Sequence, residues 1–294
     1  MPELKLKHED FPALFQSADH ASLTAQSSYY LALKSYLFLL VVAALISFYY
    51  PVDLIGALAS ALLFLITLCI LIWLKVQKPE DTWYNGRAVA ESVKTRTWRW
   101  VMKAEPYDNN TPEEQSRKEF LMDLKSILDQ NRSLSAHFQA DKTNDEAISH
   151  QMSSIRSLPF EERLAIYKNE RVKNQADWYA KKSLFNKRRA NQWFVVSVVL
   201  HALAIALLLY RISEPTLSLP IEIVATGASA ILTWLQAKKH NELNSSYSLA
   251  AHEIVLIKGE AESVDSDKAL SNFVVSSESA FSREHTQWSA RKNV

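Results

Sequence analysis

The pattern with the clearest chemical potential is a ladder of polar residues at four-residue spacing. It consists of Arg163, Tyr167, Arg171, Gln175 and Tyr179. Residues four apart share one face of a helix, so the two guanidinium groups would stand near each other. Arginine pairs well with planar anions, so the ladder could hold an anionic ligand or a carboxylate on a partner helix. A solvated helix face whose side chains support one another is the alternative, and we favour it because such pairs are common on helices.

A second candidate group lies near the C-terminus. Phe281, His285 and Trp288 share a helix face, with Arg283, Glu284 and Arg291 beside it. His285 and Glu284 hint at acid–base chemistry, but adjacent helix positions do not face each other and no nucleophile stands beside them. We therefore predict packing rather than catalysis for this group. Because no nucleophile, base or metal-ligand set converges anywhere in the sequence, we expect no enzyme activity, no metal and no cofactor.

Two acids mark the expected starts of apolar helices. Asp53 and Glu222 each stand two residues after a proline, where a carboxylate suits the positive end of the helix dipole. A ring of such carboxylates at the outer mouth of an oligomeric cation-permeable pore is the functional alternative. Small residues in the same two helices would permit close helix packing; they include Gly56, Ser60, Gly227 and Ser229.

Four apolar runs must position these residues. They cover residues 31–50, 54–74, 193–210 and 221–235. About 20 apolar residues cross a bilayer core, so the runs predict two transmembrane hairpins rather than buried helices of a soluble protein. Helix signals fill the polar segment between the hairpins, and a helix that restarts after Ser157-Leu-Pro is expected to run unbroken into the third run. The predicted fold is all-α, an integral membrane protein with four transmembrane helices as two hairpins plus a cytoplasmic helical bundle.

Basic residues flank both hairpins on one side. Lysine and arginine precede the first and third runs and follow the second and fourth, whereas the outer connections carry only Arg211. Because positive charge favours the cytoplasmic side, we expect a multi-pass protein of the inner (cytoplasmic) membrane. Both termini and the middle segment would then be cytoplasmic.

The composition excludes several kinds of partner. Lys and Arg number 33 against 32 Asp and Glu, so the chain offers no strong field for nucleic acid. Only four glycines occur, and neither the GxxxxGK nor the GxGxxG phosphate-binding pattern is present. The single cysteine, Cys69, lies inside an apolar run and allows no disulfide within one chain.

The two hairpins repeat one plan. Trp73-Leu74 near the end of the second run matches Trp234-Leu235 near the end of the fourth, at a sequence offset of 234 − 73 = 161. Ser22-Leu23 and Ser183-Leu184 match at the same offset, whereas the starts of the second and fourth runs match better at an offset of 169. Such a long period indicates a tandem domain rather than a solenoid, and the two offsets leave the register open.

Residues 83–100, which follow the first hairpin, are crowded with aromatic and charged side chains. Arg87 and Glu91 lie one helical turn apart, and Glu91 has a repeat counterpart in Glu253. The stretch either anchors a membrane exit through Trp83 or couples each hairpin to the cytoplasmic bundle, and we favour coupling. The candidate contacts for coupling, for a partner or for a ligand are Arg87, Glu91, Arg163, Tyr167, Arg171, Glu253, Arg283 and His285.

Three spaced motifs resemble one family. The first is WYNGRAVAESVK with a later Trp; the second comprises Ile148, Met152, Ile155-Arg156, Glu162-Arg163, Tyr167, Arg171, Gln175, Trp178-Tyr179 and Lys182; the third is ESAFSREHTQWSAR. Together they resemble two tandem units of the SLATT family. These are bacterial proteins with a two-transmembrane hairpin and a cytoplasmic helix, named for association with SMODS nucleotidyltransferase and SLOG domains.

The resemblance implies a domain plan. It comprises a cytoplasmic N-terminal segment (1–29), a first SLATT-like hairpin with its exit helix (30–107), a cytoplasmic helical segment (108–180), and a second SLATT-like hairpin with C-terminal cytoplasmic helices (181–294). No SMODS or SLOG domain is recognisable, so a nucleotide sensor would be a separate protein.

The resemblance also implies a function. It points to a prokaryotic membrane effector in antiviral or conflict defence, which oligomerises and forms or gates a pore once a signal arrives. The expected partners are the lipid bilayer, further copies of this chain and a separate nucleotide-sensing or defence-system protein, but no nucleic acid. A non-conducting membrane scaffold or sensor that recruits partners through its cytoplasmic helices is the alternative.

Overall fold

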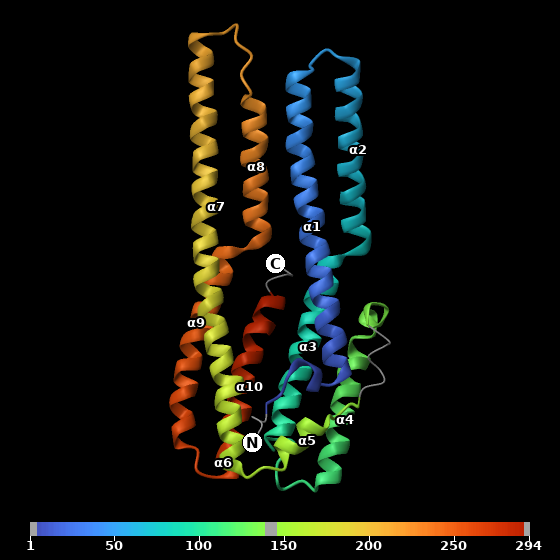
Figure 1. Ribbon diagram of the computed structural model, residues 1–294, viewed down its shortest axis with the longest axis vertical. Coiled ribbons are helices and arrows are strands. Elements are labelled where there is room, and N and C mark those ends of the chain that lie inside the picture. Colours follow the sequence, from blue (N-terminus) through green and yellow to red (C-terminus); the bar gives the residue numbers. More distant parts are fainter. Residues whose placement is uncertain (1–4, 139–145, 291–294) are drawn as a thin grey trace. The chain divides into compact units, whose positions relative to one another are not determined.

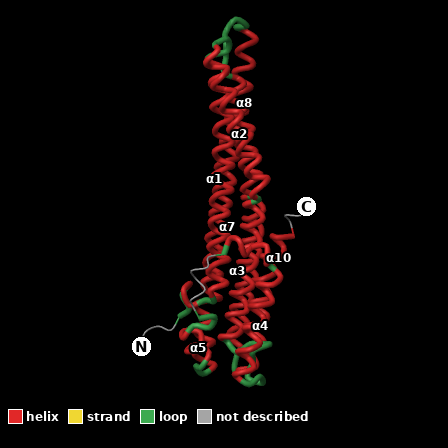
Figure 2. Tube along the Cα trace, turned by 90° about the vertical axis from the view of Figure 1, so that its right-hand side faces the viewer, coloured by secondary structure: helices red, strands yellow, loops and turns green. Residues whose placement is uncertain are grey.

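The computed structural model describes residues 5–138 and 146–290, with side chains up to residue 282. Within these ranges the chain is helical and contains no strand (Figure 2). The α-helices are α1 (Ala13–Tyr49), α2 (Leu54–Gln77), α3 (Pro79–Val101), α4 (Glu113–Gln130), α5 (His150–Arg156), α6 (Phe160–Ile166), α7 (Asn174–Ser213), α8 (Ile221–Lys238), α9 (His240–Glu260) and α10 (Asp267–Ala290) (Figure 1). A π-helical segment, η4 (Tyr167–Lys173), joins α6 to α7, and short 3₁₀ turns lie at His8–Asp10, Arg132–His137 and Ala261–Ser263.

The helices form two compact units. Unit 1 comprises Met1–Gln26, Glu80–Lys181 and Ser246–Val294, and unit 2 comprises Ser27–Pro79 and Lys182–Ser245. Unit 1 therefore gathers the polar segments from both ends and the middle of the chain, and unit 2 gathers the apolar runs.

Unit 2 contains two helical hairpins, the part of α1 from Ser27 with α2 and the part of α7 from Lys182 with α8 (Figure 1). Among the described residues, three helical stretches are long and apolar enough to cross a membrane, namely Ala13–Tyr49, Leu54–Val101, which is interrupted at Lys78, and Phe160–Ser213. The third confirms that the helix restarting after Ser157-Leu-Pro runs unbroken into the third apolar run. Large apolar side chains such as Phe38, Leu58 and Ile205 are exposed along these helices, as expected for surfaces whose solvent is lipid.

The two hairpins end with the same backbone feature. Lys78 after α2 and Lys239 after α8 both adopt a left-handed conformation, with φ of 44° and 49°. Their N–H groups donate to the carbonyls of Leu74 and Leu235, at 3.1 and 3.0 Å. Each left-handed residue ends one helix so that the next can start in a new direction. Both donors and both acceptors are related by the offset of 161 (239 − 78 and 235 − 74), which favours that register of the repeat over 169 at these positions.

A second pair of contacts follows the same register. The Ser22 hydroxyl donates to the carbonyl of Trp83 at 3.0 Å in unit 1. The Ser183 hydroxyl lies 3.4 Å from the backbone carbonyl of Asn244 in unit 2, and 3.0 Å from the side-chain oxygen of the same residue. Donors and acceptors are again related by the offset of 161 (183 − 22 and 244 − 83). The repeat in the sequence is therefore accompanied by a repeat of this serine-to-carbonyl contact.

Unit 1 has an aromatic core. Trp98 and Trp100 of α3 are only 2 % exposed. The Trp100 ring packs 5.5 Å from Phe120 of α4, and the Trp98 ring packs 5.7 Å from Tyr167. Burial of each such side chain contributes roughly 2–3 kcal/mol. Both tryptophans stabilise unit 1 and neither acts as an interfacial anchor.

Gly86 sets the close approach of α3 to α1 inside unit 1. A Cβ atom at this position would lie 3.0 Å from the carbonyl oxygen of Ala18 and 3.2 Å from the backbone nitrogen of Ser22. Glycine is therefore required because the two backbones nearly touch. This contact places the residue 83–100 stretch directly on the first turns of α1.

Candidate functional site

The polar ladder is buried in unit 1. Arg163, Tyr167, Arg171 and Tyr179 are at most 2 % exposed, so the interpretation of a solvated helix face is wrong. The face is covered because α3 and α10 pack against it, as the contacts below show. Gln175 is half-buried. The ladder thus contacts carboxylates of its own chain.

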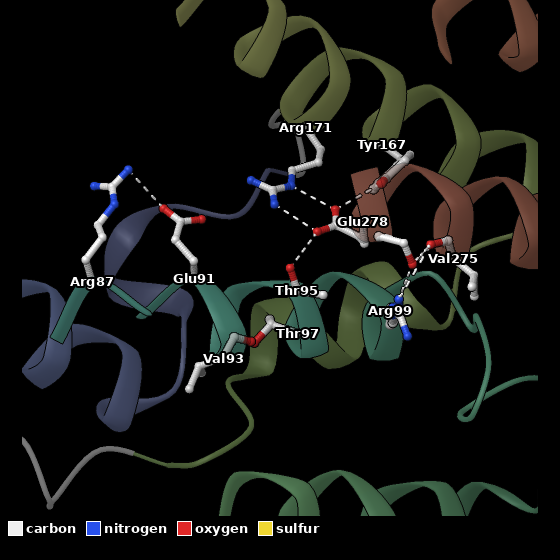
Figure 3. Close-up of polar contacts among 11 residues, drawn as sticks. Arg87, Glu91, Val93, Thr95, Thr97, Arg99, Tyr167, Arg171, Val275 and Glu278 are labelled. Atoms are coloured by element: carbon white, nitrogen blue, oxygen red, sulfur yellow. Dashed lines mark hydrogen bonds and ion pairs between the residues drawn. The ribbon is translucent and has the colours of Figure 1, made fainter. Parts of the chain in front are cut away.

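Arg171 and Glu278 form the centre of a saturated polar cluster (Figure 3). Nε and one terminal nitrogen of Arg171 each donate to a different oxygen of the Glu278 carboxylate, both at 2.8 Å. The Tyr167 hydroxyl donates to Oε1 at 2.9 Å, and the Thr95 hydroxyl donates to Oε2 at 3.0 Å. Each oxygen therefore accepts two hydrogen bonds, which is about the full capacity of a carboxylate. We call these four residues the Glu278 cluster.

The centre of the Glu278 cluster is buried. Glu278 is fully buried and Arg171 is 2 % exposed. Burial alone would lower the pKa of Arg171, but the charge of Glu278 and its hydrogen bonds raise it, so the guanidinium stays charged. Burial and the Glu278 charge raise the pKa of Tyr167 well above its ordinary value, so its hydroxyl stays a donor. A paired, hydrogen-bonded arrangement of this kind is costly to break from one side.

The backbone is unusual at the cluster. Tyr167 and Arg171 both lie in the π-helical segment η4. Hydrogen bonds from i to i+5 widen the helix there, and such segments are frequent at functional sites. The widened turn delivers both side chains to one carboxylate.

Arg163 and Arg156 hold the end of α3. One terminal nitrogen of Arg163 donates to the carbonyl of Met102 and the other to Asp267, the first residue of α10. Arg156 donates to the carbonyl of Trp100 and its Nε lies 2.9 Å from Glu113. The last carbonyls of a helix lack intrahelical partners and carry the negative end of its dipole. Two guanidinium groups therefore satisfy the C-terminal end of α3.

Charged residues of α3 surround the Glu278 cluster on one side. Arg87 and Glu91 form an ion pair at 3.2 Å, as their helical spacing predicts. Lys94 lies near Arg171, and burial lowers the pKa of Lys94, while the charge of Glu91 partly offsets this effect. Both carboxylates here, Glu91 of α3 and Glu278 of α10, are therefore paired with arginines.

The remaining candidates of unit 1 lie elsewhere. Glu253 of α9 lines a narrow gap with Tyr179 and Phe281, and no contact in the described residues joins it to Glu278. The backbones of Arg283 and His285 belong to α10, but their side chains lie outside the described residues. Trp83 is 6 % exposed and stacks on Tyr84 at 4.7 Å, so within unit 1 it is a packed residue.

The acids at the apolar helix starts occupy different local positions. The Asp53 carboxylate accepts the N–H of Gly56 at 3.0 Å and is the N-cap of α2. Glu222 is exposed in the first turn of α8. Both positions match the favourable end of the helix dipole.

The small residues of the two hairpins also differ. Gly56 lies against Tyr50, so a side chain at Gly56 would collide with it. The Ser60 hydroxyl lies 3.2 Å from the Ser47 hydroxyl, which joins α2 to α1. Gly227 has open space around it, and Ser229 is exposed. The first pair therefore packs within the chain, and the second pair lies on an open helix face.

Sequence reasoning missed two members of the cluster, Glu278 and Thr95. Glu278 lies inside the third motif, yet nothing singled it out there. A usable signal exists, because Glu278 is the only charged residue between Lys268 and Arg283. A lone acid in such a segment is buried only if a cation pairs with it. Among the described residues, no group of three or more His, Cys, Asp or Glu side chains is arranged to hold a metal ion.

Family models match both halves of the chain. Residues 12–164 match the SMODS and SLOG-associating 2TM effector domain 3, and residues 167–288 match the SMODS and SLOG-associating 2TM effector domain 1. No curated protein and no solved structure matches the chain. Thr95 belongs to the first match, and Arg171 and Glu278 belong to the second, so the Glu278 cluster joins the two. The chain belongs to the SLATT family and carries two 2TM effector domains in tandem.

Proposed function

We propose that this protein is a prokaryotic inner-membrane effector that self-associates and forms or gates a pore. The observation that carries the proposal is the double match to a 2TM effector domain, in a chain with three helices able to cross a membrane. Helix α8 supplies the fourth span, because its 18 residues reach about 27 Å at 1.5 Å per residue. The basic flanks favour cytoplasmic termini.

The Glu278 cluster is suited to control the hairpins. Helix α3 follows α2 after the single residue Lys78, and η4 continues directly into α7. Thr95 of α3 and Arg171 of η4 both bind the Glu278 carboxylate. A signal that displaces α10 would therefore release two segments that continue covalently into hairpin helices. We propose that the intact cluster holds the resting state, and that a separate sensor protein supplies the signal.

Purified protein in liposomes is expected to pass potassium ions. Replacing both outer acids (Asp53→Asn with Glu222→Gln) should lower the preference for cations over anions, because the ring of charge at the pore mouth is lost. Asparagine keeps the N-cap at position 53, so α2 remains capped. Glu214→Gln, an exposed acid in the same outer connection, is the control and should leave the preference unchanged. The measurement is the reversal potential in planar bilayers.

A conservative change in the cluster should open the protein. Tyr167→Phe removes one hydrogen bond to Glu278 and keeps the ring contacts, so ion leakage from liposomes should rise several-fold. Tyr107→Phe is the matched control, because Tyr107 is also buried and donates to a carboxylate, that of Asp123. It should cost similar stability and leave the leak unchanged. If neither variant nor the parent protein leaks ions in any oligomeric state, the result would favour the non-conducting scaffold.

A further inference from the structure

Two lysine side chains in unit 2 share one aromatic platform. Nζ of Lys34 in α1 lies 5.5 Å from the centroid of the Trp234 ring in α8. Nζ of Lys238, the last residue of α8, lies 5.0 Å from the same centroid and 3.2 Å from that of Tyr30. Cations at these distances are attracted to the ring faces. Helices from both hairpins thus bring two ammonium groups to one ring.

Further rings hold this platform in place. The Trp234 ring packs 5.8 Å from Tyr30 and 6.5 Å from Trp193 of α7, in edge-to-face geometry. Tyr30, Trp193, Trp234 and Lys238 are half-buried, and Lys34 is exposed. The site therefore has a fixed wall and an open side. We call the set of Tyr30, Lys34, Trp193, Trp234 and Lys238 the lysine–aromatic site.

The site carries uncompensated positive charge. Among the described residues, no ion pair or hydrogen bond joins the Lys34 or Lys238 ammonium to another side chain. Burial lowers the pKa of His240 of α9, and the positive charge of Lys238 lowers it further. Two like charges held near each other repel, and an anion beside both ammonium groups would offset that repulsion.

The surroundings indicate which anion. Within one to two turns of the site, Leu31 and Phe38 of α1 and Leu232 of α8 are 66 %, 68 % and 50 % exposed. A ligand that satisfies both features carries a negative group next to long apolar chains. Tryptophan and tyrosine prefer the headgroup level of a bilayer, and lysine near that level attracts anionic lipid.

We propose that the lysine–aromatic site binds the phosphate group of an anionic phospholipid. Each ammonium offers three hydrogen-bond donors, so the two lysines clamp one phosphodiester between the hairpins while the acyl chains lie along the exposed side chains of α1 and α8. A bound lipid therefore links the two hairpins. This inference does not depend on whether the protein conducts.

Native mass spectrometry of the full-length protein in detergent tests the site. Phosphatidylglycerol should bind about tenfold or more tightly than phosphatidylcholine. Lys34→Gln and Lys238→Gln should each weaken phosphatidylglycerol binding about fivefold, the effect of one lysine at an anionic surface, and the double variant about 25-fold. Phosphatidylcholine binding should not change in any of them. Unchanged thermal melting confirms that the variants are folded.

Lys75→Gln is the matched control. Lys75 is an exposed lysine two residues after Trp73 near the end of the first hairpin, whereas Lys238 lies four residues after Trp234. If Lys75→Gln weakens phosphatidylglycerol binding as much as Lys34→Gln does, the attraction is diffuse and the proposal is wrong. If the parent protein binds phosphatidylglycerol and phosphatidylcholine equally well, the proposal is also wrong. If millimolar glycerol phosphate, which lacks acyl chains, displaces the lipid, the site serves a soluble phosphate and the lipid assignment is overturned.

Discussion

Glu278→Ala should destabilise unit 1 by about 3–5 kcal/mol, the usual cost of leaving one half of a buried ion pair. The substitution leaves the charged Arg171 guanidinium, which is 2 % exposed, without its carboxylate, and the Tyr167 hydroxyl loses its hydrogen-bond acceptor. Nothing else in the described part of unit 1 replaces the four hydrogen bonds that this carboxylate accepts. Thermal melting in detergent, followed by circular dichroism, measures the loss.

Two further variants separate charge from packing. Glu278→Gln keeps the shape and part of the hydrogen bonding but removes the charge, so it should also destabilise, because Arg171 remains uncompensated. The double variant Arg171→Met with Glu278→Leu removes both charges and should recover most of the stability. Glu114→Ala is the surface control, since Glu114 pairs with Lys118 in an exposed i, i+4 arrangement, and it should change stability by less than about 0.5 kcal/mol. A similarly small effect of Glu278→Ala would show that the cluster is not a structural lock.

Arg156→Met should cost about 2–4 kcal/mol, because several buried acceptors lose a charged donor at once. Arg156 donates to the carbonyls of Trp100 and Tyr107, with the second bond at 3.1 Å, and to the Ser116 hydroxyl at 2.9 Å. The guanidinium carbon also lies 4.7 Å from the centroid of the Trp100 ring. Methionine fills part of the volume but donates no hydrogen bond, so the contacts that join the end of α3 to the start of α4 are lost.

Lysine at this position tests the geometry rather than the charge. Arg156→Lys keeps one positive charge but cannot present the planar fork of donors, so it should recover less than half of the loss. Arg132→Met is the control, because Arg132 is 79 % exposed and pairs with Asp129 three residues earlier. Denaturant titration in micelles measures all three variants. If Arg156→Met resembled Arg132→Met, the contacts at the end of α3 would carry no stability.

Local pattern alone predicts most of the helical framework. Four apolar runs, the helix restart after Ser157-Leu-Pro and the tandem plan were readable because helix formation and hydropathy depend on neighbours in sequence. The Arg87–Glu91 pair was readable for the same reason, since four-residue spacing fixes proximity on a helix. The three motifs sufficed to predict the family.

The burial of the polar ladder, and its pairing with Glu278, could not be predicted from local sequence pattern. An arginine at helical spacing looks the same whether it faces water or a carboxylate on a helix far away in the sequence. The choice depends on α10 packing against η4 and α3, which is a long-range event. The π-helical turn at Tyr167–Lys173 has the same origin, because the polar ladder in the sequence fits an ordinary α-helix equally well.

The sequence by itself determined that this chain is all-helical, belongs in a membrane family and carries one unit twice. These properties follow from composition, periodicity and motif spacing. Only the tertiary structure decided that Glu278 is the partner of Arg171, that Trp98 and Trp100 belong to a core, and that the repeat keeps one register at Lys78 and Lys239. Each of these depends on which distant helices pack together, and burial then turns a single charge or left-handed residue into a fixed contact.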